Sequence, residues 1–271
     1  MANQQKILHT VVCLTPIFIL TISQRMRNAV TISLSTAFFG LSYAFLKYFR
    51  ILTPKEGKLG KAIEAEWRSR IIGSINAIIL TIGGIISFLE WSTLTPEEGW
   101  VDAGRVPVFL SCFFAGYLHW DLCWLVWHSH ENHDPASLFH HILYISITHY
   151  LLHGRYFARP FAWCSFAEIS TPFLHLRWFL AVENKKESPW YMVWSLCFAG
   201  TFLLSRVFIF SLGMIDIWKN IQYWGHLPKG IYGVVFGLHC GQMLNLYWST
   251  KVISALLRLI SRRKDGPKIK K

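Results

Sequence analysis

Residues 106–127, VPVFLSCFFAGYLHWDLCWLVW, form the stretch that decides the class of fold. The stretch is apolar almost throughout and contains one histidine, His119, and one carboxylate, Asp121. A helix of about 20 mainly apolar residues is long enough to cross the hydrocarbon core of a bilayer. Residues 106–127 therefore predict a transmembrane helix, and the two polar side chains are expected to face a protein interior or water rather than lipid.

Apolar runs of similar length lie on both sides of this stretch. Hydrophobic residues make up 53% of the 271-residue chain, whereas soluble domains rarely exceed about half. The sequence therefore predicts an all-α integral membrane protein with seven spans, and an eighth if the first and shortest run also crosses. Pro172 is expected to kink the helix that contains it. The predicted segments are 7–22, 30–49, 71–89, 106–127, 137–152, 160–180, 190–214 and 230–260.

Positive charge is concentrated in short loops and at the C-terminus. The formal net charge is +12, yet the basic residues do not share one folded surface of the kind that suits nucleic acid. Lysine and arginine favour the cytoplasmic side of a membrane, so the loop near residues 50–61 and the C-terminal tail are expected to be cytoplasmic. The loop with Glu90, Glu97, Glu98 and Asp102 is expected on the opposite side.

Several polar side chains interrupt the apolar runs, and a charged one costs at least about 2.5 kcal/mol if it faces lipid. Asp121 and His128 are seven residues apart, as are Glu168 and His175, so each pair shares one face of its helix. Such inward faces predict a polar-lined cavity inside the helix bundle. The side chains expected to line it are His119, Trp124, His175, Gln242 and Asn245.

The doublet His140–His141 lies at the start of the run at 137–152. Adjacent helical side chains diverge by about 100°, so at least one imidazole is expected to point inward. It can act as a general base or as a nucleophile that accepts an acyl group, with Asp121 or Glu168 orienting it. The alternative is that all these groups are interhelical hydrogen-bond partners that set packing, worth about 0.6 kcal/mol each.

A second histidine cluster, with His128, His130, His133 and Asp134, raises the question of a metal. Membrane di-iron enzymes draw their ligands from several histidine boxes, whereas this chain has one doublet and one loop cluster. A wet interfacial loop explains the cluster equally well. We therefore expect no metal and no other cofactor.

Three motifs together resemble the TLC domain family. They are Asp121 in its helix, the doublet in Phe139-His140-His141-Ile142-Leu143-Tyr144, and Phe166-Ala167-Glu168-Ile169-Ser170-Thr171-Pro172-Phe173 followed by Arg177-Trp178-Phe179. The resemblance spans about Glu66 to Lys251 and is strongest to the subgroup named TLC-domain-containing protein 4. It implies a six-helix TLC domain around a central cavity at 63–260. N-terminal hydrophobic segments and a basic cytoplasmic loop at 1–62 would precede it, and a basic cytoplasmic tail at 261–271 would follow.

The resemblance also implies a functional class. Ceramide synthases, the enzymatic branch, acylate a sphingoid base from acyl-CoA and carry a histidine doublet that His140 and His141 match. They have a His-Asp-x-x-Asp arrangement where this chain has Ala167 to Pro172, so Glu168 alone can stand in for an aspartate. Relatives outside that branch look like regulators of membrane lipid composition.

The leading hypothesis is therefore a lipid-homeostasis protein of the endoplasmic reticulum or a related membrane that binds acyl chains or phospholipids in its cavity. The alternative is an acyl-CoA-dependent acyltransferase that uses His140 or His141. Membrane lipids are the expected partners, with acyl-CoA in the second case, and nucleic acid is not expected. A transporter would need a continuous chain of ionisable groups, and beyond one cluster the sequence offers only His239. An enzyme needs a histidine within about 3 Å of a carboxylate or of the reacting atom.

Overall fold

The computed structural model of the protein describes residues 2–52, 54, 59–91, 97–101, 104–128, 135–154 and 156–264. Within these ranges it describes side chains from residue 24 to residue 261, apart from residues 91, 101 and 158. Every regular element in the described ranges is helical. His130, His133, Asp134, Asp102 and the basic tail after residue 264 lie outside the described residues.

The helices join into seven long rods in the described part of the chain, because α6, η1 and α7 are continuous, as are α8, η2 and α9. Four helical stretches are long and apolar enough to cross a bilayer, namely Gln24–Phe49, Lys61–Glu90, Glu98–Trp127 and Pro189–Lys219. The elements are α1 (Ala2–Phe49), α2 (Lys61–Trp91), α3 (Glu98–Val101), α4 (Arg105–Trp127), α5 (Pro135–Gly154), α6 (Ala158–Ser165), η1 (Phe166–Ser170), α7 (Thr171–Val182), α8 (Pro189–Phe202), η2 (Leu203–Ile209), α9 (Phe210–Lys219), α10 (Ile221–Trp224) and α11 (Gly230–Lys264).

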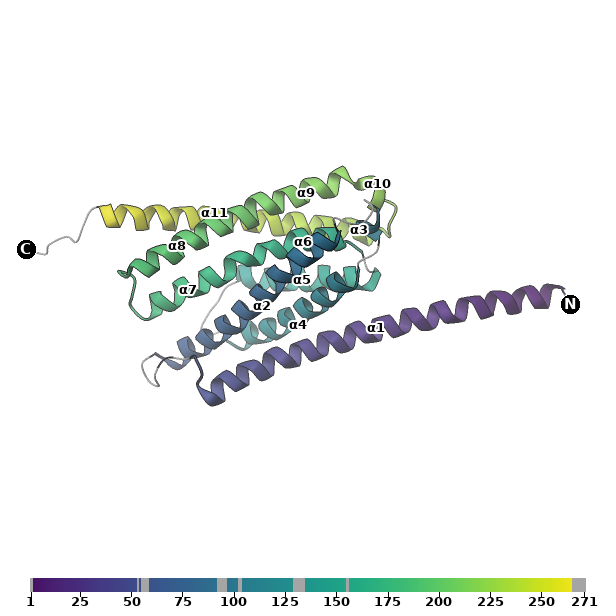
Figure 1. Cartoon of the computed structure of the whole chain (residues 1–271), viewed down its shortest axis with the longest axis horizontal. Helices are drawn as coiled ribbons and strands as arrows, with labels where there is room; N and C mark the ends of the chain where they lie inside the picture. The colour runs from purple at the N-terminus through teal and green to yellow at the C-terminus, as the bar shows by residue number, and fades with distance from the viewer. Residues whose placement is uncertain are drawn as a thin grey trace, which may run out of the picture.

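The rods coincide with the predicted apolar runs from 30–49 onward, but the N-terminal prediction needs correction. The runs 7–22 and 30–49 are not separate segments, because α1 continues through both (Figure 1). The polar residues between the two runs include no proline or glycine, so nothing in the backbone ends the helix there. The side chains of residues 7–22 lie outside the described set.

Pro172 alters the hydrogen bonding of its helix in the turn just before its own position. Proline has no N–H group and its ring clashes with the carbonyl four residues earlier, which here belongs to Glu168. The Glu168 carbonyl instead accepts from the backbone N–H of Thr171, three residues on, and η1 is a 3₁₀ helix over Phe166–Ser170. The expected distortion is therefore a tightened turn that contains Glu168.

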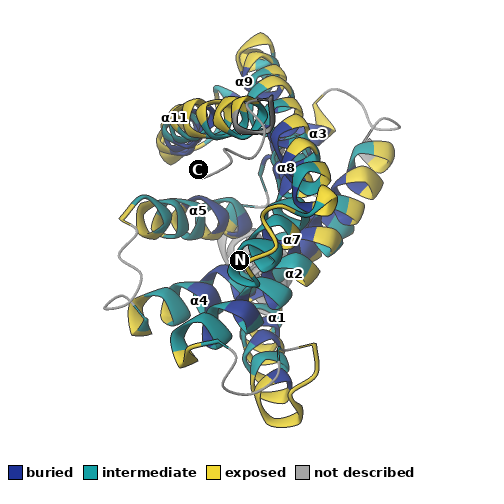
Figure 2. Cartoon of the chain, turned by 90° about the vertical axis from the view of Figure 1, so that its left-hand side faces the viewer, coloured by how far each residue is buried: buried dark blue, intermediate teal, exposed yellow. Residues whose placement is uncertain are grey.

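Six rods form a closed ring, which Figure 2 shows nearly end-on. Around the ring, α2 packs on α4, α4 on α5, α5 on α11, α11 on α8, α8 on α7, and α7 on α2. Helix α1 lies outside the ring against α4. Gly116 permits that contact, because a Cβ there would lie 2.4 Å from the Ser35 Cβ, and Thr36 Oγ1 donates to the Gly116 carbonyl at 3.2 Å.

Successive rods alternate in direction, so α1, α4, α7 and α11 all end at one end of the bundle (Figure 1). We call this the tail end. A tight turn joins α7 to α8 there, with Asn184 in a left-handed conformation at φ 60°. The N–H of Lys185 donates to the Leu180 carbonyl and that of Asn184 to the Ala181 carbonyl, the pattern of a Schellman cap.

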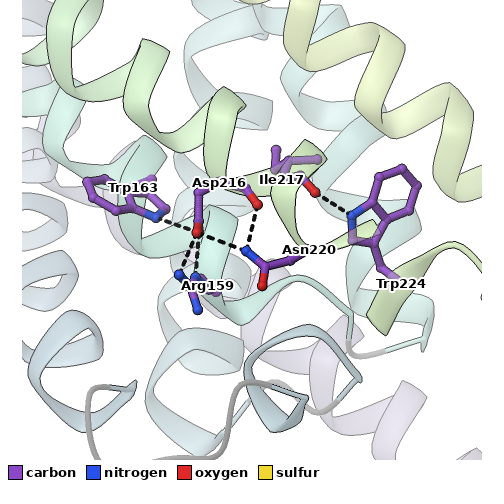
Figure 3. A network of polar contacts seen from close by, with 6 residues as sticks. All are labelled: Arg159, Trp163, Asp216, Ile217, Asn220 and Trp224. Atoms are coloured by element: carbon purple, nitrogen blue, oxygen red, sulfur yellow. Dashed lines mark hydrogen bonds and ion pairs between the residues drawn. The ribbon is translucent and has the colours of Figure 1, made fainter. Parts of the chain in front are cut away.

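An ion pair fastens two rods near the opposite end. Arg159 of α6 bonds to the carboxylate of Asp216 on α9 (Figure 3). Trp163 Nε1 donates to the same carboxylate at 3.2 Å and Asn220 Nδ2 at 3.0 Å. No pattern in the sequence predicts this network, because its partners come from different rods.

Candidate functional site

The ring encloses a cavity of about 810 Å³ in its tail-end half. Residues from α2, α4, α5, η1, α7, α8, η2 and α11 line it, so every ring rod contributes. Its lining is unusually rich in ionisable side chains for a membrane segment. Those side chains are Glu66, Arg70, Asp121, His140, His141, Glu168, His175, Arg177, Arg206 and Lys251.

A second, narrow pocket of about 60 Å³ continues from the cavity toward the opposite end. It is mainly apolar, with Leu80, Ile147 and Leu238 among its walls. The two spaces share four lining residues, Phe114, His140, Glu168 and Arg206. We call His140, Glu168 and Arg206 the polar belt, since they lie where the wide space, with its many ionisable side chains, meets the narrow and mainly apolar one.

His141 is engaged at both ring nitrogens. Its Nε2 lies 2.8 Å from Asp121 Oδ2 and its Nδ1 lies 2.7 Å from the Ser137 carbonyl oxygen. The carbonyl can only accept, so Nδ1 carries a hydrogen, and the proton between Nε2 and Oδ2 belongs to the His141–Asp121 pair. Neither nitrogen offers a free lone pair, so in this geometry His141 positions its neighbours rather than reacting.

His140 has the opposite character. Neither of its ring nitrogens has a hydrogen-bond partner among the described residues, and the imidazole lines both the cavity and the narrow pocket. Its ring packs against Tyr144, at 4.7 Å between centroids, and Trp248, at 5.7 Å. Of the doublet, His140 is therefore the imidazole with a lone pair available to a ligand.

Glu168 bonds to neither histidine. Arg206 Nη2 lies 3.2 Å from Glu168 Oε1, and Thr171 Oγ1 donates to Oε2 at 3.0 Å. Arg206 also donates to Ser170 Oγ at 3.2 Å. Arg206 lies in the π-helical segment η2 and Glu168 in the 3₁₀ segment η1, so two irregular turns meet at the belt. Such turns often occur at functional sites.

The predicted lining residues divide into two groups. Trp124 and His175 line the cavity, where Ser74 Oγ lies 2.8 Å from His175 Nδ1, and Asn245 lines the narrow pocket. His119 and Gln242 line neither of these two spaces.

Helical geometry explains why His119 does not line the cavity. Positions two apart on a helix differ by about 200°, so His119 cannot share the face of Asp121. Its Nδ1 bonds to the Ala115 carbonyl at 2.7 Å and its ring packs on His149 at 5.1 Å. Gln242 donates to Ser211 Oγ at 2.8 Å and accepts from Asn245 at 3.4 Å. It therefore links α11 to α9.

The basic residues of the cavity are not among the predicted lining residues. Arg70, Arg177, Arg206 and Lys251 all line it. Arg206 had a usable signal, since it is the single charged residue in the apolar run 190–214 and an ionisable residue inside a span marks a functional position by default. Arg70 directly precedes the predicted run 71–89, where a basic residue is expected at the interface. Lys251 lies inside the run 230–260 and therefore carried the same signal as Arg206.

Histidines that could form a metal site do not converge in the described part of the chain, where no group of three or more His, Cys, Asp or Glu side chains has ligand geometry. His128 caps α4, with Nδ1 2.9 Å from the Trp124 carbonyl and its ring stacked on Trp124 at 4.3 Å. It thus turns back on its own helix.

A closed ring of helices around a cavity with a polar belt defines an all-α integral membrane protein with an internal cavity. The family model for the TLC domain matches residues 66–254, and the chain belongs to the TLC domain family. It is thus a membrane protein of a lipid-related family.

Curated relatives carry the name TLC domain-containing protein 4. The Xenopus tropicalis protein is 25% identical over 231 residues, covering 82% of this chain and 85% of the relative. The Dictyostelium discoideum protein, TLC domain-containing protein 4 A, is 24% identical, with 82% and 86% covered. The human protein is 23% identical, with 82% and 87% covered.

Proposed function

We propose that the protein binds an acyl lipid inside its helical ring and thereby regulates the lipid composition of the membrane that holds it. The observation that carries this proposal is the shared lining of the two spaces, since His140, Glu168 and Arg206 belong to both. A wide polar cavity that narrows into an apolar pocket suits an amphiphile, with its polar group at the belt and apolar groups beyond it.

The energetics favour the same kind of ligand. Each methylene group removed from water contributes about 0.8 kcal/mol, so the apolar pocket favours the start of a hydrocarbon chain. Polar groups at the belt lose about 1–3 kcal/mol each if they are buried without partners. An amphiphile supplies a hydrogen-bond partner to His140 and apolar surface to the pocket, whereas a purely apolar ligand leaves His140 without a partner; Glu168 and Arg206 already pair with each other.

The proposal includes location and orientation. Basic residues at the tail end, such as Arg68 on α2 and the adjacent pair Lys185 and Lys186 in the α7–α8 turn, favour a cytoplasmic tail end under the positive-inside rule. The resemblance to the TLC family supports residence in the endoplasmic reticulum or a related membrane.

A pocket-filling variant tests lipid binding. Cys164 lines the narrow pocket, and Cys164→Phe is expected to displace the lipid that copurifies with the wild-type protein. Cys123 is exposed and lines neither space, so Cys123→Phe serves as the matched control. Native mass spectrometry of the proteins in detergent measures bound lipid. Equal lipid occupancy in all three proteins, or none in the wild type, would contradict the proposal.

Acyl transfer is the second candidate, and the free imidazole of His140 favours it. The His141–Asp121 distance of 2.8 Å meets the geometric condition for an enzyme, although the residue that it leaves free to react is His140. In the candidate reaction a nitrogen of His140 attacks the acyl-CoA carbonyl, the carbon–sulfur bond breaks and the thiol leaves. A lipid hydroxyl or amine then takes the acyl group and returns its proton to His140.

Intact mass spectrometry after incubation with palmitoyl-CoA separates the two candidates. Acyl transfer predicts a palmitoyl adduct in the wild type and in Asp121→Asn at reduced yield, and none in His140→Ala. An adduct that persists in His140→Ala excludes this role for His140. Bound lipid without any adduct or acylated product leaves the non-enzymatic function as the better explanation.

A further inference from the structure

The charges that line the cavity do not balance. Three acidic groups have partners, since Arg70 pairs with Glu66 at 2.6 Å, Arg206 with Glu168 at 3.2 Å and His141 with Asp121 at 2.8 Å. Each pair has no net charge, and for His141–Asp121 this holds whichever group keeps the shared proton. The remaining charged side chains of the lining, Arg177 and Lys251, have no carboxylate partner among the described residues.

Both unpaired cations are oriented by neutral neighbours. Arg177 Nε donates to Ser195 Oγ at 3.2 Å, and its guanidinium lies 5.4 Å from the centre of the Tyr191 ring. Lys251 Nζ lies 4.4 Å from the centre of the Tyr247 ring. A guanidinium has five N–H donors and an ammonium has three, so most of their donors remain for a ligand. Two charges of the same sign favour an anion with several acceptor oxygens.

Both cations lie on the tail-end side of the polar belt. Along α7, Arg177 follows Thr171, a hydrogen-bond partner of Glu168, by six residues. Along α11, Lys251 follows Trp248, whose ring contacts His140, by three residues. At 1.5 Å per helical residue these offsets are about 9 Å and about 4.5 Å. An anion held by both cations therefore lies roughly 5–9 Å from the belt along the bundle.

This offset distinguishes between amphiphiles that carry phosphate. An extended chain advances about 1.25 Å per bond, judged from the trans peptide spacing. In a glycerophospholipid about five bonds separate phosphorus from the nearer ester carbonyl carbon, or about 6 Å. In an acyl-CoA roughly fourteen bonds separate the nearest phosphorus from the thioester carbonyl, or about 17 Å. The offset fits the phospholipid.

We infer that Arg177 and Lys251 bind the phosphate of a glycerophospholipid whose ester carbonyl lies level with His140 and the polar belt. The inference rests on the proposed lipid-binding function and adds the class of ligand. The headgroup faces the tail end, where Lys251 is exposed, and the acyl chain leads toward the narrow pocket.

The test measures the affinity of the purified full-length protein for three probes by native mass spectrometry. The probes are palmitoyl-oleoyl phosphatidic acid, palmitoyl-oleoyl glycerol, which has the same chains without phosphate, and palmitoyl-CoA. Wild type is expected to bind phosphatidic acid at least about tenfold more tightly than the neutral diglyceride. Palmitoyl-CoA is expected to bind more weakly than phosphatidic acid.

Variants that remove charge test whether Arg177 and Lys251 cause the preference for phosphatidic acid over the diglyceride. Arg177→Gln/Lys251→Gln is expected to lower affinity for phosphatidic acid to that of the diglyceride and leave diglyceride binding unchanged, which also shows that the cavity is intact. Arg177→Lys/Lys251→Arg is expected to retain the preference. Lys186→Gln/Arg258→Gln removes two exposed charges from the same end, outside the cavity lining, and is expected to behave as wild type.

Failure of the lipid-binding function and failure of the phosphate site give different results. If none of the probes binds the wild type, the proposed lipid-binding function fails. If phosphatidic acid and diglyceride bind equally, or if the preference survives in Arg177→Gln/Lys251→Gln, only the phosphate site fails. Tighter binding of palmitoyl-CoA, lost in the same variant, would overturn the glycerophospholipid assignment in favour of an acyl-CoA phosphate.

Discussion

Arg206, in the π-helical segment η2, pairs at 3.2 Å with Glu168, in the 3₁₀ segment η1. The two residues come from neighbouring rods and meet where the wide cavity narrows. Pro172 sets the position of the glutamate, because it tightens the turn before it. The pair therefore holds together the two walls of the ring at the level of His140.

Removing Arg206 is expected to destabilise the protein strongly. In Arg206→Met the Glu168 carboxylate stays inside the ring without its cation, and breaking a buried pair in this way costs about 3–5 kcal/mol. The free energy of unfolding in detergent, from a denaturant titration, measures the effect. Glu168→Gln/Arg206→Met removes both charges and is expected to recover most of the loss. A double variant as unstable as the single one would mean that Arg206 stabilises through its packing alone.

The Arg159–Asp216 pair gives a second stability prediction. Asp216→Ala removes the carboxylate to which Arg159, Trp163 and Asn220 all bond, so a loss of about 3 kcal/mol is expected. Glu183→Gln breaks the pair with Lys185, which is 55% exposed, and is expected to cost less than about 1 kcal/mol. Thermal unfolding of both variants makes the comparison. Similar shifts in the two would contradict the structural role of Asp216.

The bilayer explains why the rods could be predicted from sequence. A segment that crosses hydrocarbon must satisfy its backbone internally and remain apolar over its full length, so the runs from 30–49 to 230–260 mark helices directly. The two runs 7–22 and 30–49, by contrast, belong to one continuous helix, α1. Polarity alone suggested a break between them, but the residues between the runs contain no helix breaker.

The candidate site was only partly predictable. Asp121 and the doublet could be singled out because ionisable groups in apolar runs are costly, and the structure places His141 Nε2 2.8 Å from Asp121 Oδ2. The pairing of Glu168 with Arg206 could not be predicted, since Arg206 lies 38 positions away and only the fold brings it near. His119 shows that polarity without helical phase gives the wrong face.

The two histidines of the doublet are expected to differ in their effect on stability. His141→Ala leaves the Asp121 carboxylate buried without its main partner, which costs about 2–4 kcal/mol. His140→Ala removes a ring with no hydrogen bond among the described residues and is expected to cost about 1 kcal/mol of packing with Tyr144 and Trp248. Denaturant titration in detergent compares the two. Equal losses would show that His140 has a structural partner of its own.

The contact between α1 and the ring depends on Gly116. A Cβ at this position would meet the Ser35 Cβ at 2.4 Å and the Ile32 carbonyl at 2.8 Å, so Gly116→Val requires the two helices to separate. Because α1 lies outside the ring, the ring cavity is expected to remain intact while α1 detaches. Cysteines introduced at Tyr43 of α1 and Trp120 of α4, whose rings lie 5.9 Å apart, should be joined by a short bifunctional thiol crosslinker in the otherwise unchanged protein and lose that crosslink when Gly116→Val is added. Retained lipid binding shows that the ring persists. A crosslink that survives Gly116→Val would mean that backbone shifts absorb the clash, and a loss of lipid binding together with the crosslink would mean that α1 supports the ring itself.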